Sequence, residues 1–149
     1  MTTASIDWQA RAREAAFDGR ALIDGARRDA LAGETFVKAS PIDGRTLGPV
    51  ARGREADIDA AVKSACAAFA DGRWCGKPPA ARKKILQRFA DKILAAKEEL
   101  ALLETLDMGK PIQYSLSVDV PSAARTIAWY AEAIDKVYDE IAPTPASWP

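Results

Sequence analysis

The sequence holds 149 residues, which suits one domain of ordinary size, and its 48% hydrophobic and 28% charged residues are typical of a globular rather than a disordered protein. Its 21 basic and 21 acidic residues balance, which argues against nucleic acid or an anionic membrane surface as a partner. Histidine is absent, so the commonest general base and the Ser–His and Cys–His nucleophilic pairs are excluded.

The sequence shows neither a membrane-spanning segment nor a secretory signal. No apolar run approaches the roughly 18 residues of a spanning helix. The first residues, MTTASIDWQARAREAAF, lack a basic region followed by an apolar core. We therefore expect a cytoplasmic protein without a membrane partner.

The N-terminal part of the chain predicts one short helix and two β-hairpins. Residues 7–17 are rich in Ala and Arg and favour a surface helix. The pair DG at residues 24–25, between short apolar flanks, indicates a two-residue hairpin turn. The segment PIDG at residues 41–44 predicts the turn of a second hairpin, and Pro49 suggests an edge strand. Both hairpins are expected within residues 20–53.

Residues 55–141 predict helices. The first, at residues 55–70, has one apolar stripe, and a second follows the two prolines at residues 78–79. The segment AAKEELALLETLD at residues 95–107 predicts a third helix, and Asp119 is expected to cap a last one. The stripe of the first helix consists of Ile58, Val62, Ala65 and Phe69; the third helix directs Leu100, Leu103 and Leu106 inward; the last runs through Tyr138.

The two cysteines, nine residues apart, do not have a metal-binding spacing. Cys66 lies in an Ala-rich helical run and is interpreted as a small buried side chain. Cys75 follows a glycine-containing turn, where Arg73 and Lys77 would favour a reactive thiolate. A disulfide is not expected in a cytoplasmic protein.

These elements do not add up to a self-sufficient catalytic domain. Two hairpins are too few for a sheet of useful size, so the helical stripes have no central sheet to cover. The sequence contains neither G-x-G-x-x-G nor G-x-x-x-x-G-K-[ST], and no paired-carboxylate pattern stands out. We therefore expect the chain to be part of something larger.

Several stretches resemble the aldehyde dehydrogenase superfamily. Residues 39–69, ASPIDGRTLGPVARGREADIDAAVKSACAAF, resemble its N-terminal hairpin and first main helix, and ELALLETLDMGKPI at residues 99–112 resembles its E-T-x-D-x-G-K-P segment. DVPSAARTIAWYAEAIDKVY at residues 119–138 resembles the long helix that follows. The details are most similar to γ-glutamyl-γ-aminobutyraldehyde dehydrogenases of putrescine use, with other aminoaldehyde and betaine-aldehyde enzymes as close alternatives. The entry to the second helix also matches, through Trp74, Pro78 and Arg82.

The resemblance runs from Trp8 to Ala142. It implies an α/β fold with a Rossmann-like cofactor domain, and it makes residues 1–149 the mostly helical N-terminal portion of such an enzyme. It implies oxidation of an aldehyde to a carboxylic acid by a cysteine thiolate, hydride transfer to NAD or NADP, and water activated by a Glu. In the family these groups lie downstream of this segment. We therefore expect no catalytic and no cofactor-binding residue here, a truncated enzyme that is inactive alone, and a homo-oligomer.

Two alternatives remain open from the sequence. The first concerns the whole chain, which could be a helical protein-interaction module without catalysis. The second concerns Asp107, which the resemblance places at a monovalent-cation site completed by backbone oxygens of Lys38 and Ala39. Asp107 could equally serve only to anchor the end of a helix.

Overall fold

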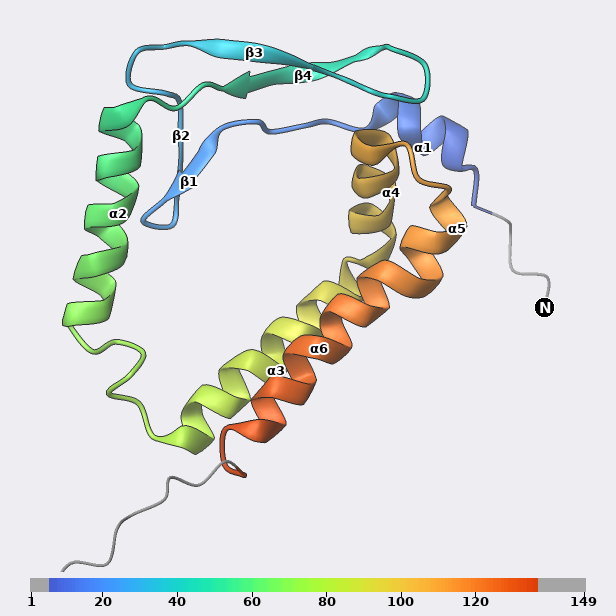
Figure 1. Cartoon of the computed structure of the whole chain (residues 1–149). Helices are drawn as coiled ribbons and strands as arrows, with labels where there is room; N and C mark the ends of the chain where they lie inside the picture. The colour runs from blue at the N-terminus through green and yellow to red at the C-terminus, as the bar shows by residue number, and fades with distance from the viewer. Residues whose placement is uncertain (1–5, 137–149) are drawn as a thin grey trace, which may run out of the picture.

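The computed structural model describes residues 6–136, and these residues trace an open frame (Figure 1). The elements in chain order are α1 (Trp8–Glu14), β1 (Ala21–Ile23), β2 (Ala26–Arg28), β3 (Thr35–Ala39), β4 (Thr46–Ala51), α2 (Glu55–Ala70), α3 (Pro79–Ala95), α4 (Lys97–Met108), α5 (Ile112–Tyr114), the π-helical turn η1 (Ser115–Asp119) and α6 (Val120–Ala133). The hairpin of β3 and β4 forms one side of the frame, and α2, with the hairpin of β1 and β2 beside it, forms a second. The pair of α3 and α6 forms a third side, and α4 with α1 and α5 forms the fourth. The prediction of two early hairpins followed by helices is confirmed.

The hairpins follow from their turn residues. Asp24 and Gly25 have φ of 52° and 72°, which is the type I′ turn that joins two strands through two residues. β1 pairs antiparallel with β2, and β3 with β4, as separate two-stranded sheets. Gly19 makes a bridge to Val50, where an added Cβ would lie 2.3 Å from the carbonyl oxygen of Pro49. Only glycine permits this contact, which ties the connection after α1 to the second hairpin.

Helix α2 begins at a carboxylate that also holds the preceding loop. The Asp57 side chain accepts the backbone N–H of Arg54 at 2.9 Å and that of Leu31, also at 2.9 Å. These bonds to the ionised form lower the pKa of Asp57. The Arg54 guanidinium adds an ion pair to Glu34 at 2.5 Å. The loop after β2 and the start of α2 are therefore joined at one point.

Helices α3 and α6 run antiparallel, side by side, and form the most extensive helix contact of the frame (Figure 1). Small side chains line the contact, because Ala90 on α3 and Ala124 and Ala131 on α6 are buried. Alanines let two backbones approach closely. At the far end of the pair, Lys83 bonds to Glu132 at 2.7 Å and to Asp135 at 3.1 Å.

Three predictions about the helices are wrong. Asp119 caps nothing: the helical backbone runs on from Ile112 through η1 to Ala133, and the N–H of Val120 bonds to the carbonyl of Ser115 in π-helical fashion. This wider turn lies just before Pro121, which has no N–H to donate to the residue four positions earlier. The predicted end of α6 at Tyr138 lies outside the described residues.

The other two errors concern burial. Leu100 is exposed and Leu103 half-buried, whereas Ala101 and Leu102 are buried beside Leu106, so α4 is turned by about one residue from the predicted face. Cys66 was expected to be buried and is exposed, because nothing among residues 6–136 covers its side of α2.

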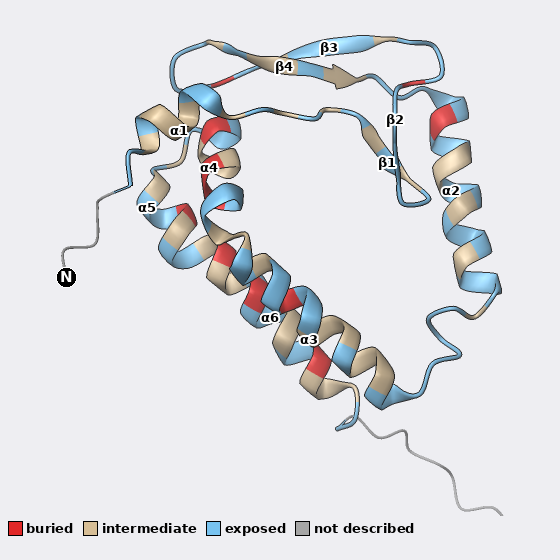
Figure 2. Cartoon of the chain, turned by 180° about the vertical axis from the view of Figure 1, so that it is seen from behind, coloured by how far each residue is buried: buried red, intermediate tan, exposed pale blue. Residues whose placement is uncertain are grey.

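The buried core of the described residues is small, and it follows α4 and the α3–α6 pair (Figure 2). Its apolar members are small or medium-sized, whereas several large aromatic side chains of the described residues are exposed. The buried apolar residues are Ala30, Ala90, Ala101, Leu102, Leu106, Val120, Ala124 and Ala131, and the exposed aromatic ones include Phe36, Phe69, Phe89 and Trp129. This distribution supports the expectation that the chain is part of a larger fold.

Candidate functional site

The candidate site lies where the end of α4 meets the turn between β3 and β4. Helix α4 ends at Gly109, whose left-handed backbone (φ 80°) lets its N–H bond to the carbonyl of Thr105 at 2.9 Å. A Cβ on Gly109 would lie 3.1 Å from Cγ of Pro41 in the hairpin turn. Glycine is therefore required twice here, once by the backbone conformation and once by the close approach of Pro41.

The structure brings two of the predicted cation-site residues together, as an ion pair. The Lys38 ammonium lies 2.9 Å from Oδ1 of Asp107, beside a hollow of about 340 Å³. The ladder between β3 and β4 is irregular at Lys38 and Ala39, the two residues whose backbone oxygens were expected as ligands. Within residues 6–136 there is no group of three or more His, Cys, Asp or Glu that could hold a metal ion.

A second ion pair joins the loop after α4 to the π-helical turn. The Lys110 ammonium contacts Oδ2 of Asp119, and this bond raises the pKa of Lys110 above its ordinary value. The sequence did not predict this pair. A lysine and an aspartate nine residues apart meet only because the chain reverses at Pro111 and because η1 turns Asp119 back toward the loop.

Two buried serines also belong to the candidate site, where the end of α4 meets the turn between β3 and β4. Ser115, fully buried at the start of η1, accepts a hydrogen bond from the Thr105 hydroxyl at 3.5 Å. Ser40, which is 2% exposed, accepts the backbone N–H of Ile42 at 3.3 Å within the hairpin turn. The two hydroxyls form hydrogen bonds that hold the hairpin turn and the start of η1 in place.

The arginine that was expected to activate the thiol of Cys75 is paired with a carboxylate. Cys75 is exposed, and its sulfur lies 3.9 Å from the carbonyl oxygen of Phe69. Arg73, which the sequence suggested as an activator, donates instead to Asp71 at 2.7 Å and lowers the pKa of that carboxyl. Among residues 6–136, the contacts of the candidate site position and pack the end of α4, the hairpin turn and η1.

The comparisons with known proteins all point to one family. A model described as "Aldehyde dehydrogenase family" matches residues 28–148. The NADP/NAD-dependent aldehyde dehydrogenase PuuC of Escherichia coli (strain K12) is 49% identical over 137 residues, which is 92% of this chain and 28% of PuuC.

Solved structures agree with this match. The γ-glutamyl-γ-aminobutyraldehyde dehydrogenase of Burkholderia cenocepacia J2315 superposes with a TM-score of 0.90 at 53% identity, over 93% of this chain and 28% of that one. The indole-3-acetaldehyde dehydrogenase AldA of P. syringae, solved as a mutant with NAD+ and IAA, gives a TM-score of 0.91 at 52% identity, over 94% of this chain and 28% of that one. The chain thus spans little more than a quarter of the length of these relatives.

Proposed function

Because the chain belongs to the aldehyde dehydrogenase family, we propose that it serves as the N-terminal region of an NAD(P)-dependent aldehyde dehydrogenase that acts on aminoaldehydes. The observation that carries this proposal is the match to the Burkholderia cenocepacia enzyme, at 53% identity with a TM-score of 0.90. The substrate named for that enzyme would place this chain in putrescine use. Indole-3-acetaldehyde is the competing substrate, since AldA is as similar.

The proposed reaction oxidises an aldehyde to a carboxylic acid, and the nicotinamide cofactor would supply the hydride acceptor. The residues of this chain do not fit the binding of that cofactor, because the described part has no glycine-rich turn between a strand and a helix. No step of the reaction is therefore assigned to them, and residues 1–149 alone are expected to be inactive. We assign the chain a structural role within a cytoplasmic homo-oligomer.

That role is carried by the junction between the hairpin turn and α4. Pro41 against Gly109, Lys38 with Asp107, and Lys110 with Asp119 fix three successive segments to one another. In a complete enzyme, these contacts would hold α6 at a set distance from the hairpin side of the frame.

We also propose that Asp107 takes part in a monovalent-cation site with backbone oxygens of Lys38 and Ala39. Oxygen ligands suit a hard cation. The Lys38 ammonium would compete, because it already neutralises the same carboxylate. In an enzyme containing this segment, potassium chloride should raise the thermal midpoint more than tetramethylammonium chloride does, and Asp107→Asn should abolish the difference. Equal midpoints in both salts for the parent would leave Asp107 as a helix anchor only.

The function is tested by a chimera in which residues 6–136 replace the matched segment of the Burkholderia cenocepacia enzyme. We expect NADH formation with γ-glutamyl-γ-aminobutyraldehyde, and less with indole-3-acetaldehyde. The isolated chain should give none. A folded chimera without activity toward any aldehyde would refute the proposal. Robust NADH formation by the isolated chain would refute the assignment of catalysis to other parts of the enzyme.

The alternative, a helical interaction module without catalysis, is favoured by one observation, the many exposed apolar side chains. It predicts a stable isolated chain, and a chimera that folds but has no activity.

A further inference from the structure

The dipeptide Asp-Gly occurs four times in the chain, at residues 18–19, 24–25, 43–44 and 71–72. Asp-Gly rearranges readily without an enzyme, because glycine has no side chain to shield its backbone nitrogen from the aspartyl carboxyl group. Three conditions favour this rearrangement: a carboxyl group without strong partners, a glycine N–H without a hydrogen bond, and a backbone that can move. The four copies lie in different local structures, so the three conditions distinguish them.

In three of the four copies, the carboxylate accepts the backbone N–H of the arginine that follows the glycine. The pairs are Asp18 with Arg20 at 3.2 Å, Asp43 with Arg45 at 3.1 Å, and Asp71 with Arg73 at 2.8 Å. In the first and third pairs the guanidinium also donates through Nε, at 2.9 Å to Asp18 and at 2.7 Å to Asp71. These bonds lower the pKa of both carboxyl groups. Because the rearrangement needs the neutral carboxyl, whose hydroxyl leaves as water, these bonds slow it.

The glycine N–H is bonded in two of these three copies. Gly44 donates to the carbonyl of Ser40 at 2.9 Å, and Gly72 donates to the carbonyl of Phe69 at 3.2 Å. Each bond must open before the nitrogen can attack a carboxyl group. The ordinary net strength of one such bond corresponds to an attack that is about fivefold slower.

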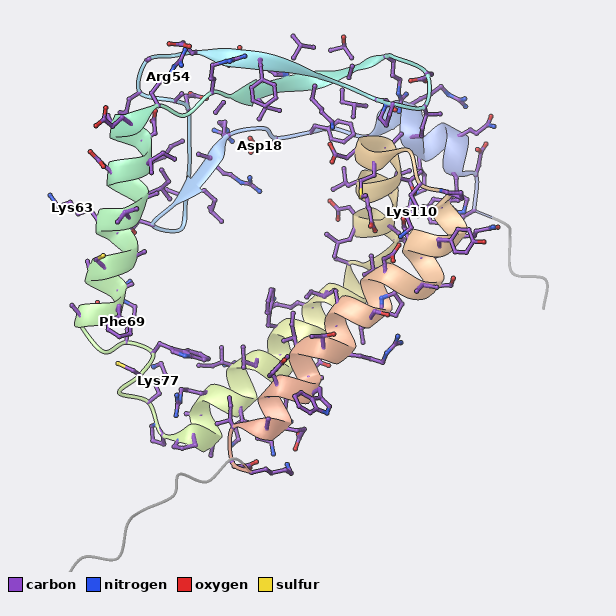
Figure 3. All side chains as sticks on the ribbon, in the orientation of Figure 1. Asp18, Arg54, Lys63, Phe69, Lys77 and Lys110 are labelled. Atoms are coloured by element: carbon purple, nitrogen blue, oxygen red, sulfur yellow. The ribbon has the colours of Figure 1, made fainter. Side chains whose placement is uncertain are left out.

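The copy at residues 18–19 is held by packing instead. Asp18 lies on the connection from α1 to β1, close to the hairpin of β3 and β4 (Figure 3). Gly19 forms the bridge to Val50, and its carbonyl accepts the N–H of Ala51 at 2.9 Å. The peptide between Asp18 and Gly19 therefore cannot turn toward the carboxyl group without breaking this contact.

The copy at residues 24–25 meets the first two conditions. Among residues 6–136, neither the carboxylate of Asp24 nor the N–H of Gly25 forms a hydrogen bond. The pKa of Arg73 is raised by its bonds to Asp71 and further by the charge of Asp24, but its guanidinium stays with Asp71. Both residues of the turn are exposed, and a Cβ added to Gly25 would meet nothing within 4 Å (Figure 2).

The same copy also meets the third condition, a backbone that can move. Strands β1 and β2 have three residues each, and every residue of β2 is exposed. A two-stranded hairpin of this kind is marginally stable, so it opens locally more often than the helices do. Asp24 is also the non-glycine residue of the described chain that has a positive φ, 52°. An L side chain is strained in this left-handed conformation, and opening of the turn releases that strain.

We propose that Asp24 is a modification site, at which the chain rearranges spontaneously from aspartate to isoaspartate. The nitrogen of Gly25 attacks the side-chain carboxyl carbon of Asp24, a C–N bond forms, and the carboxyl hydroxyl leaves with the amide proton as water. Water then opens the cyclic imide. Opening at the side-chain carbonyl restores aspartate, whereas opening at the backbone carbonyl gives isoaspartate with the same mass. The balance requires neither an oxidant nor a cofactor.

The modification changes the main chain of the hairpin. Isoaspartate adds one methylene to the backbone, and a two-residue type I′ turn does not accommodate it. The pairing of β1 with β2 is therefore disturbed beside α2, with which β1 is in contact (Figure 1). The product also carries a free backbone-derived carboxylate. This group is the substrate of carboxyl methyltransferases that recognise isoaspartate, and such an enzyme is the partner class that the site would take.

Trypsin separates the four copies, because it releases them on four peptides, residues 14–20, 21–27, 39–45 and 64–73. The chain is incubated at physiological temperature and pH, digested, and analysed by chromatography with electron-transfer mass spectrometry. Methylation by an isoaspartate-specific methyltransferase gives a second readout. We expect isoaspartate to form in peptide 21–27 at least about fivefold faster than in each of the other three. In urea, which removes the protecting bonds, the four rates should become similar.

The variant Asp24→Glu supplies the control, because a glutamyl side chain would have to close a larger ring. It should remove most of the methylation and leave the other three peptides unchanged. Equal rates on the four peptides of the folded chain would overturn the proposal, as would a faster rate on any peptide other than 21–27. Circular dichroism reports whether the chain keeps its structure alone. If it does not, the same four peptides are compared in the chimera, with the same outcomes for and against the proposal.

Discussion

Replacing Gly109 by alanine tests whether the end of α4 is fixed by backbone conformation alone or also by the hairpin turn. Alanine in the left-handed region costs about 1–2 kcal/mol, of which the stiffer unfolded chain returns about 0.4–1 kcal/mol. At Gly109 the added methyl would also lie 3.1 Å from Cγ of Pro41, so the turn must shift. Such overpacking costs a further ~1–3 kcal/mol. The expected loss is therefore about 2–3 kcal/mol in the free energy of unfolding.

Gly33 supplies the matched control. Its φ of 67° is close to the 80° of Gly109, but an added Cβ at Gly33 meets nothing within 4 Å. Gly33→Ala should therefore lose only the backbone contribution, about 0.5–1 kcal/mol. Urea unfolding of the chimera, followed by circular dichroism, measures both. Equal losses at the two glycines would refute the role of Pro41, and Pro41→Ala should remove most of the extra cost if the reasoning holds.

Three further predictions concern the helices and the junction. The bonds from Lys83 and Lys136 lower the pKa of Glu132 to about 2, below its ordinary 4.5, so their stabilisation of the folded state is complete above pH 4.5 and is lost as the pH falls toward 2. Glu132→Gln should flatten this acid dependence of unfolding, followed by Trp fluorescence. An unchanged profile would contradict the prediction. Ala124→Leu should lower the free energy of unfolding by about 1–3 kcal/mol, because the larger side chain pushes α3 away from α6. Ala123→Leu, at an exposed position, should lower it by less than ~0.5 kcal/mol in the same urea titration. Equal losses would show that the contact between the two helices is loosely packed. Lys110→Met should lower the thermal midpoint more than Lys84→Met does, because of these two lysines only Lys110 contacts the buried carboxylate oxygen of Asp119. Equal midpoints of the two variants would refute a structural role for the Lys110–Asp119 pair.

Turns and helix limits could be read from the sequence, since their causes are local. The pair Asp24-Gly25 and the segment at residues 41–44 each specify a hairpin turn, and α2 begins and ends where the apolar period and Gly72 predicted. Helix spacing also identified the stripe of α2. It could not say which surface that stripe faces, because the period of a helix carries no information about neighbouring elements.

The errors arose where tertiary contacts decide. The sequence predicts Asp119 as a helix cap, but the π-helical turn before Pro121 keeps the helix continuous. The side chain of Asp119 forms an ion pair with Lys110 instead. Leu102 rather than Leu103 is buried, because α4 is oriented by α1 and η1, which sequence periodicity does not weigh. The meeting of Lys38 with Asp107 was anticipated only through the family resemblance; nothing in the residue spacing indicated it.

The carboxylate of Asp57 has a mechanical consequence for the frame. It holds the backbone of Leu31 and of Arg54 at once, so the first turn of α2 is fixed to the loop after β2. A helix rises about 1.5 Å per residue, so Phe69 stands roughly 20 Å from that attachment. A rotation of about 10° at Asp57 would displace Phe69 by about 3 Å, which is more than half of the ~5.4 Å pitch of a helix. The direction of α2 is therefore set by two hydrogen bonds in its first turn together with its contact with β1, and a small change at Asp57 is magnified toward Phe69.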